Sequence, residues 1–173
     1  MTPSSTSPAV PAAHEAITLL RACGDTVATA ESLTGGLVAA ALTEVPGSSW
    51  VVLGGVVAYA SAVKASLLGV SPDLLEHGGA VQAEVASAMA ANARRVFGAQ
   101  WGISTTGVAG PDPADGRPVG TVYVGLSGPE GDTVTVLNLT GDRAQIRAAT
   151  VLASLDRLTG AVRAHVAGPS GYR

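Results

Sequence analysis

Residues 28–36 have the sequence Ala-Thr-Ala-Glu-Ser-Leu-Thr-Gly-Gly, in which a short apolar run ends at a hydroxyl and two glycines. The β-prone residues from Thr26 to Ala30 predict a strand. The apolar residues after the glycines predict a helix from about Thr34 to Glu44, which ends before Pro46. This segment is therefore expected to form a strand–turn–helix unit with Ser32 at the turn.

Ser32 stands where a nucleophile would face backbone N–H groups. The first turn of a helix presents unpaired donors and the positive end of its dipole, and glycines let a substrate approach the main chain closely. The N–H groups of Thr34, Gly35 and Gly36 are therefore candidates for stabilising an oxyanion. The alternative is that Ser32 or Thr34 only caps the helix, which is the more frequent role of such a motif.

The rest of the chain alternates helical and strand patterns. Helical spacing of apolar residues predicts further helices at 12–23, 61–68, 72–76, 83–97 and, capped by Asp142, from there to about Leu158. Further strands are predicted at 51–59, 101–106, 119–126 and 133–139, the last two forming a hairpin. Gly54 and Gly55 inside the second strand indicate a bulge or close packing.

This order of elements predicts an α/β fold. We expect a three-layer α/β/α sandwich around a mixed, mainly parallel sheet of about five strands, including an antiparallel hairpin at the C-terminal end. A chain of 173 residues is long enough for one domain with a substantial core, which we place at 11–167. Residues 1–10, rich in Ser, Thr and Pro, are expected to be a disordered tail, and 168–173 a flexible one.

Composition restricts the classes of function. The net charge of -3, without a cluster of Lys or Arg, argues against a nucleic-acid partner and is compatible with a small-molecule enzyme. The uncharged stretch 45–63 contains Pro46 and paired glycines and is a poor membrane span, and residues 1–10 lack the features of a signal peptide. We therefore expect a cytoplasmic protein without a membrane partner.

The low counts of Cys, His and aromatic residues have three further consequences. Cys23 is the single cysteine, which excludes an internal disulfide, and the three His are scattered. We expect no metal and no cofactor. Because aromatics make up only 3% of the chain, small side chains must pack helices closely onto the sheet, and a homo-oligomer, a dimer or larger, is expected.

Three predicted strands deliver polar side chains to one edge of the sheet, where ligands of such folds bind. Ser32, Tyr59 and Thr106, the last followed by Gly107, stand at these strand ends. Lys64 would serve as the base for Ser32 if burial lowered its pKa, and Tyr59 would relay the proton or donate a hydrogen bond to the leaving nitrogen. The alternatives are a solvated lysine and a tyrosine that only ends its strand. Short-chain dehydrogenases also combine Ser, Tyr and Lys, but no Gly-x-Gly-x-x-Gly follows the first strand.

The order of the motifs resembles a known family. The matching blocks are Ala30-Glu31-Ser32-Leu33-Thr34-Gly35-Gly36, Val45-Pro46-Gly47-Ser48-Ser49, Gly54-Gly55-Val56-Val57-Ala58-Tyr59, Lys64 with Leu67-Leu68-Gly69-Val70, Gly79-Ala80-Val81, Thr106-Gly107-Val108-Ala109-Gly110-Pro111 and Pro118-Val119-Gly120-Thr121-Val122. Over roughly 12–158 the chain closely resembles the C-terminal domain of the competence and damage-inducible protein CinA, in its stand-alone form as nicotinamide-nucleotide amidase.

The resemblance implies a metal-free hydrolysis of nicotinamide mononucleotide to nicotinic acid mononucleotide and ammonia, a step of pyridine-nucleotide salvage. Its substrate would be a small nucleotide. Ser32 is implied to be the nucleophile, Tyr59 and Lys64 its activating pair, and Thr106 part of the pocket. We add Arg117, in the long irregular loop 107–120, as a candidate for the phosphate, against the alternative of a solvated loop arginine.

Three positions depart from the usual family pattern. Leu33 stands where a cysteine is common, Gln82 replaces a usual serine, and residues 60–63 read Ala-Ser-Ala-Val in place of Ser-Asn-x-x. The departures at Leu33 and Gln82 motivate an alternative function, a binding or regulatory module in competence or DNA damage with little or no turnover. A further alternative is an amidase for another pyridine or nucleoside carboxamide.

Overall fold

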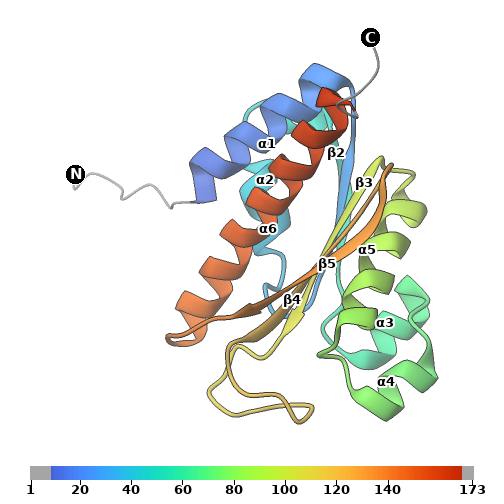
Figure 1. Ribbon diagram of the computed structural model, residues 1–173, viewed down its shortest axis with the longest axis vertical. Coiled ribbons are helices and arrows are strands. Elements are labelled where there is room, and N and C mark those ends of the chain that lie inside the picture. Colours follow the sequence, from blue (N-terminus) through green and yellow to red (C-terminus); the bar gives the residue numbers. More distant parts are fainter. Residues whose placement is uncertain (1–8, 169–173) are drawn as a thin grey trace.

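The computed structural model describes residues 9–168, a sheet between two layers of helices (Figure 1). The strands are β1 (Val27–Glu31), β2 (Val52–Val57), β3 (Trp101–Gly107), β4 (Thr121–Gly128) and β5 (Gly131–Asn138). The helices are α1 (Ala9–Cys23), α2 (Leu37–Thr43), α3 (Ser61–Leu68), α4 (Pro72–Gly78), α5 (Ala83–Phe97) and α6 (Arg143–Ala167), with a 3-10 turn, η1 (Ser48–Trp50). Most of the two predicted tails, 1–8 and 169–173, lies outside the described residues.

The sheet has the strand order β2-β1-β3-β4-β5. β1 pairs in parallel with β2 and with β3, whereas β4 is antiparallel to β3 and to β5. Val27 pairs with Val52 but Ala28 pairs with Gly54, so β2 contains a bulge beside the paired glycines. The predicted mixed sheet, its C-terminal hairpin and the irregularity in the second strand are confirmed.

Each face of the sheet carries its own helical layer. Figure 1 shows α1, α2 and α6 on one side of the sheet and α3, α4 and α5 on the other. The first layer contributes larger aliphatic side chains to the core, among them Leu20, Leu42, Ile146 and Leu155. The second packs through small ones, since a Cβ added to Gly102 in β3 would lie 2.1 Å from the carbonyl oxygen of Ala90 in α5. The predicted close contact of helix and sheet through small residues is confirmed on this face.

Two helices extend further than their sequence patterns predict. α1 begins at Ala9, so residues 9 and 10, assigned above to the tail, are helical. Asp142 caps α6 as predicted, by accepting a hydrogen bond from the N–H of Gln145, whose side chain in turn accepts from the Asp142 N–H. The helix continues past Leu158 to Ala167, because Val162 extends its buried face.

The parallel arrangement of β1, β2 and β3 brings their carboxyl ends to one edge of the sheet. Ser32 follows the end of β1, Tyr59 lies two residues beyond β2, and Thr106 and Gly107 end β3. In residues 9–168, none of the helices combines the length and apolar character needed to cross a membrane.

Candidate active site

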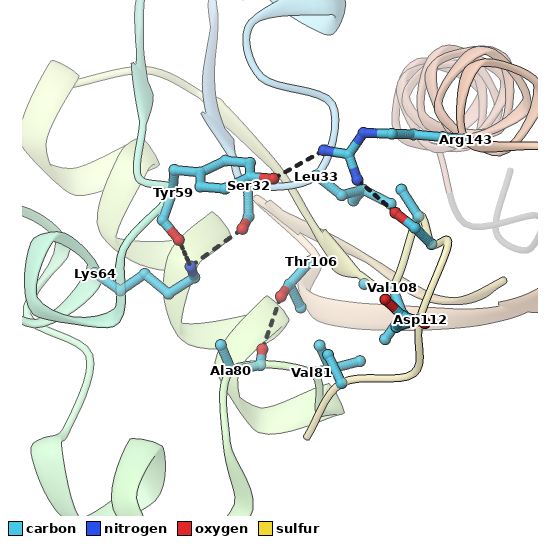
Figure 2. Close-up of a pocket in the computed structure, with 14 residues that line it drawn as sticks. Ser32, Leu33, Tyr59, Lys64, Ala80, Val81, Thr106, Val108, Asp112 and Arg143 are labelled. Carbon is cyan, nitrogen blue, oxygen red and sulfur yellow. Dashed lines mark hydrogen bonds between the residues drawn. The ribbon is translucent and has the colours of Figure 1, made fainter. Parts of the chain in front are cut away.

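A cavity of about 210 Å³ lies at this edge of the sheet (Figure 2). Its walls come from the strand ends, from the start of α3, from the segment before α5, from the loop between β3 and β4, and from the start of α6. The sequence-predicted residues that line it are Ser32, Tyr59, Lys64, Thr106 and Gly107. Five of the nine predicted site residues therefore meet in one cavity.

Ser32 and Lys64 are in direct contact in this cavity. The Lys64 Nζ lies 3.1 Å from the Ser32 Oγ and donates a 2.9 Å hydrogen bond to the carbonyl oxygen of Tyr59. Lys64 is 1% exposed and Ser32 9% exposed. The short turn after β2 starts α3 at Ser61, so Lys64, one turn into the helix, reaches back across the strand ends. The pair has the geometry of a nucleophile and its base.

Burial lowers the pKa of the Lys64 ammonium, because the charged form loses its hydration. The negative charge of Asp115 acts in the opposite direction and only partly offsets this effect. Within residues 9–168, no carboxylate lies within ion-pair distance of Lys64. At a given pH, a larger fraction of Lys64 is therefore neutral than of a solvated lysine, and the neutral amine can accept a proton from Ser32.

Tyr59 contacts the pair through its backbone. Its carbonyl oxygen accepts from Lys64, whereas its hydroxyl accepts a 2.9 Å hydrogen bond from the guanidinium of Arg143. The Tyr59 side chain is 60% exposed at the mouth of the cavity. Figure 2 shows the phenol turned toward Arg143 and the carbonyl turned toward Lys64. The phenolic proton relay expected above has no hydrogen-bonded connection to Lys64 in this arrangement.

The turn after Ser32 is organised by Glu31, which is 1% exposed. Its carboxylate accepts hydrogen bonds from the Thr34 hydroxyl and from the N–H groups of Gly36, Val38 and Ala39, at 2.7 to 3.0 Å. The carboxylate thus satisfies the donors at the start of α2, and neither Ser32 nor Thr34 is its N-cap. Sequence reasoning did not identify this role, although an acidic residue at the end of a buried strand was its signal.

The turn leaves fewer free N–H groups than the sequence suggested. Gly35 donates to the Ser32 carbonyl and Gly36 to Glu31, so these two are already engaged. Among residues 9–168, the N–H groups of Leu33 and Thr34 donate to no acceptor of the protein. Arg147 of α6 binds the carbonyl oxygens of Leu33 and Thr34 at 3.0 and 2.8 Å. Because a trans peptide places N–H opposite C=O, the Thr34 N–H points away from Arg147.

Replacing Glu31 with Gln tests its role in organising this turn. The amide can accept at only one of its two ends, so at least one buried donor would face an NH2 group. We expect the free energy of unfolding to fall by about 1–3 kcal/mol, measured by urea denaturation. The matched control is Glu44→Gln at the exposed end of α2, expected to change it by less than about 0.5 kcal/mol. Equal effects of the two variants would contradict this role.

The cavity contains a cation that the sequence analysis did not select. Arg143, the first residue of α6, lines the cavity mouth and binds the carbonyl oxygen of Gly110 at 2.8 Å as well as Tyr59. Arg117, the predicted phosphate ligand, does not line the cavity, and its backbone instead closes a tight turn with Ala114. No local motif marks Arg143, since it reaches the site only through the packing of α6.

Thr34 and Thr106 are both buried and hydrogen-bonded within the protein. Thr34 Oγ1 lies between Glu31 and Thr105, which removes it from the cavity. Thr106 lines the cavity, and its hydroxyl donates to the Ala80 carbonyl at 2.7 Å, which ties β3 to the segment before α5. In residues 9–168, no cluster of three His, Cys, Asp or Glu side chains could hold a metal ion.

Comparison with known proteins places the chain in a family. The model of the CinA C-terminal domain family matches residues 10–162. The chain belongs to this family. A CinA-like protein of Frankia casuarinae is 52% identical over 131 residues, which cover 76% of this chain and 30% of that protein. A CinA-like protein of a Synechocystis species is 50% identical over 126 residues, covering 72% of this chain and 30% of that protein. The chain thus spans about a third of these CinA-like relatives.

Solved structures of CinA proteins have the same fold. A competence/damage-inducible protein from Agrobacterium tumefaciens has a TM-score of 0.87 at 36% identity, over 92% of this chain and 99% of its own. A CinA superfamily protein from Escherichia coli has a TM-score of 0.85 at 30% identity, over 91% and 92% of the two chains. The predicted α/β class is confirmed.

The departures from the usual CinA pattern lie mostly outside the cavity. Gln82 is the N-cap residue of α5, and its side chain binds the carbonyl oxygens of Leu74 and Gly79. Residues 60–63 form the N-cap and first turn of α3 and do not line the cavity. Leu33 does line it. Of the three departures, one therefore lies in the cavity wall, that at Leu33.

Proposed function

We propose that this CinA domain hydrolyses the carboxamide of nicotinamide mononucleotide, giving nicotinic acid mononucleotide and ammonia. The observation that carries the proposal is the 3.1 Å contact between the Ser32 hydroxyl and the buried amine of Lys64, inside a cavity with a guanidinium at its mouth. Family membership and the resemblance to nicotinamide-nucleotide amidases supply the substrate class.

The first half of the reaction forms an ester on Ser32. Neutral Lys64 takes the hydroxyl proton as the Ser32 oxygen attacks the amide carbon. The resulting oxyanion is stabilised by N–H groups of the turn, and those of Leu33 and Thr34 are the candidates. The residue after a nucleophile often supplies such a donor. Lys64 then donates its proton to the leaving nitrogen, and ammonia departs.

The second half returns the enzyme to its starting state. Water enters the position that ammonia vacated, Lys64 accepts its proton, and the resulting hydroxide attacks the ester. Collapse of the second tetrahedral intermediate releases the carboxylic acid, and the proton returns from Lys64 to the Ser32 oxygen. Lys64 thus alternates between base and acid.

The nucleotide phosphate is proposed to lie against Arg143. The reacting amide must reach the buried pair, so the ribose phosphate would remain at the mouth, where Arg143 is exposed. A guanidinium matches phosphate oxygens in a planar fork. We expect Arg143→Met to raise KM for nicotinamide mononucleotide by about 10- to 100-fold, with a smaller change in kcat.

Two comparisons make the Arg143 prediction specific. Turnover of nicotinamide riboside, which has no phosphate, should be nearly the same in Arg143→Met and wild type. Arg117→Met is the matched control and should leave KM within about twofold, because Arg117 lies outside the cavity. A large KM effect of Arg117→Met and none of Arg143→Met would reverse the assignment.

An ammonia-release assay on the purified protein tests the function itself. Nicotinamide mononucleotide, its riboside, free nicotinamide and an unrelated nucleoside carboxamide form the substrate panel. Release from the nucleotide supports the proposal, and release from another amide alone would change the substrate. Tight binding of the nucleotide without ammonia would favour the binding or regulatory module.

A further inference from the structure

A side chain from the loop between β3 and β4 binds the backbone of the cavity wall that lies opposite Ser32. Asp115 Oδ2 accepts hydrogen bonds from the N–H of Ala80 at 2.6 Å and from the N–H of Val81 at 3.2 Å. Ala80 and Val81 line the cavity, as do Asp112 and Ala114 of the same loop. The Asp115 contacts therefore join two walls that are separated by more than 30 residues of sequence.

The backbone of Ala80 is hydrogen-bonded at both its N–H and its carbonyl oxygen. Asp115 binds its N–H, while the Thr106 hydroxyl donates to its carbonyl oxygen at 2.7 Å (Figure 2 shows the Thr106 contact). An ionised carboxylate that accepts two successive backbone N–H groups forms the stronger, charge-assisted kind of hydrogen bond. The position of Ala80 is thus determined by β3 on one side and by the loop on the other.

The backbone conformations of Gly79 and Asp115 permit this contact. Gly79 has a φ of +71°, and a Cβ added there would lie 2.4 Å from Asp115 Cγ. Asp115 itself has a φ of +50° and is the one non-glycine residue with positive φ in the described part of the chain. Such conformations cost free energy and persist where the surroundings enforce them. Two residues on separate segments thus adopt unusual conformations that permit one contact.

We propose that Asp115 is a positioning residue that latches the loop 108–120 onto residues 79–81 and so holds the cavity closed around Ser32 and Lys64. The consequence for catalysis rests on the function proposed above. The latch itself is a property of the folded chain. It fixes the wall against which the substrate packs, and it places a negative charge near the catalytic amine.

The charge of Asp115 has an effect separate from its hydrogen bonds. It raises the pKa of Lys64 against the effect of burial. Besides Lys64, the charged side chains that line the cavity are Asp112 and Arg143. Removing the Asp115 charge with the latch in place should therefore lower the pKa of Lys64 further. The acidic limb of the kcat profile, which requires neutral Lys64, should then move to lower pH.

Hydrogen exchange tests the latch without reference to activity. In Asp115→Gly, which suits the positive φ but removes the carboxylate, exchange of the Ala80 and Val81 amides should become at least about tenfold faster. Gly79→Ala should have the same effect, because its Cβ displaces the carboxylate. The double variant should then exchange no faster than Asp115→Gly alone. Unchanged exchange in Asp115→Gly would overturn the proposal.

Kinetics test the role of the latch in positioning. Asp115→Gly should raise KM for nicotinamide mononucleotide by about tenfold while preserving the thermal midpoint of unfolding. Asp115→Asn, which keeps an acceptor oxygen, should change KM less but should shift the acidic limb. Asp156→Asn, the same change on an exposed part of α6, should alter neither.

The two proposals fail in different ways. Altered exchange in Asp115→Gly, combined with no ammonia release from the wild type, would retain the latch and reject the amidase function. Ammonia release combined with identical exchange, KM and pH profile in all the Asp115 variants would retain the function and reject the latch.

Discussion

Ser32→Ala is expected to reduce ammonia release from nicotinamide mononucleotide by about 10⁴-fold or more, because without the hydroxyl no ester can form. The fold should tolerate the change, since the Ser32 side chain is small and its hydroxyl is hydrogen-bonded to Lys64. The measurement is kcat, with binding of the nucleotide followed separately by calorimetry. Binding should persist, since the contacts at the cavity mouth are unchanged.

The matched control for Ser32→Ala is Ser66→Ala, on the exposed side of α3. Its kcat should equal that of the wild type. Trapping provides a second test, since a slowly hydrolysed acyl compound should add mass to the wild type and not to Ser32→Ala. Turnover of Ser32→Ala within tenfold of the wild type would exclude a serine ester mechanism.

Lys64→Met is expected to reduce kcat by a similar factor, because the proton of Ser32 then has no acceptor. Methionine has nearly the length of lysine and suits a site where the side chain is 1% exposed. Lys64→Cys, made with Cys23→Ser and alkylated to an aminoethyl side chain, should recover part of the activity. Normal kcat in Lys64→Met would remove lysine from the mechanism.

Lys64→Met should also change how stability depends on pH. Burial lowers the pKa of Lys64 in the folded chain, so between that pKa and the ordinary lysine value the unfolded chain binds more protons. The free energy of unfolding of the wild type should therefore rise with pH in this window, and below it burial of the ammonium is destabilising. Lys64→Met should be more stable than the wild type at lower pH and should lack this rise.

Activity should follow the same ionisation with the same sign. The kcat of the wild type should increase with pH as Lys64 loses its proton, with a midpoint below the ordinary value for lysine, because desolvation lowers its pKa. A gain in stability together with a loss of activity on Lys64→Met would show that this lysine is retained for chemistry.

The sequence predicted the fold more completely than the site. Apolar periodicity and turn residues are local properties, so the strands and helices were identified with errors mainly at their ends. The largest difference was at the end of α6, which continues past Leu158 to Ala167. The start of α2 also differed, since the expected helix from Thr34 begins at Leu37. The cause is Glu31, whose carboxylate binds N–H groups up to eight residues along the chain and displaces the helix start.

The composition of the site could be predicted only in part. Ser32, Tyr59 and Thr106 were placed at one edge because parallel neighbouring strands end together, which is a general property of such sheets. Which atoms of these residues are in contact could not be predicted. Tyr59 presents its carbonyl oxygen to Lys64, and a local pattern cannot distinguish this arrangement from one that uses the phenol.

The sequence alone determined the α/β class, the family resemblance and the presence of a serine at a strand end followed by glycines, because each depends on residues close together in the chain. The tertiary structure alone decided that Arg143 rather than Arg117 lines the cavity and that Asp115 binds the wall at Ala80. These contacts join segments 30 or more residues apart, and their partners are selected by strand order and helix packing. Many sequences with the same local pattern would pack differently, so the arrangement of the site follows from the fold as a whole.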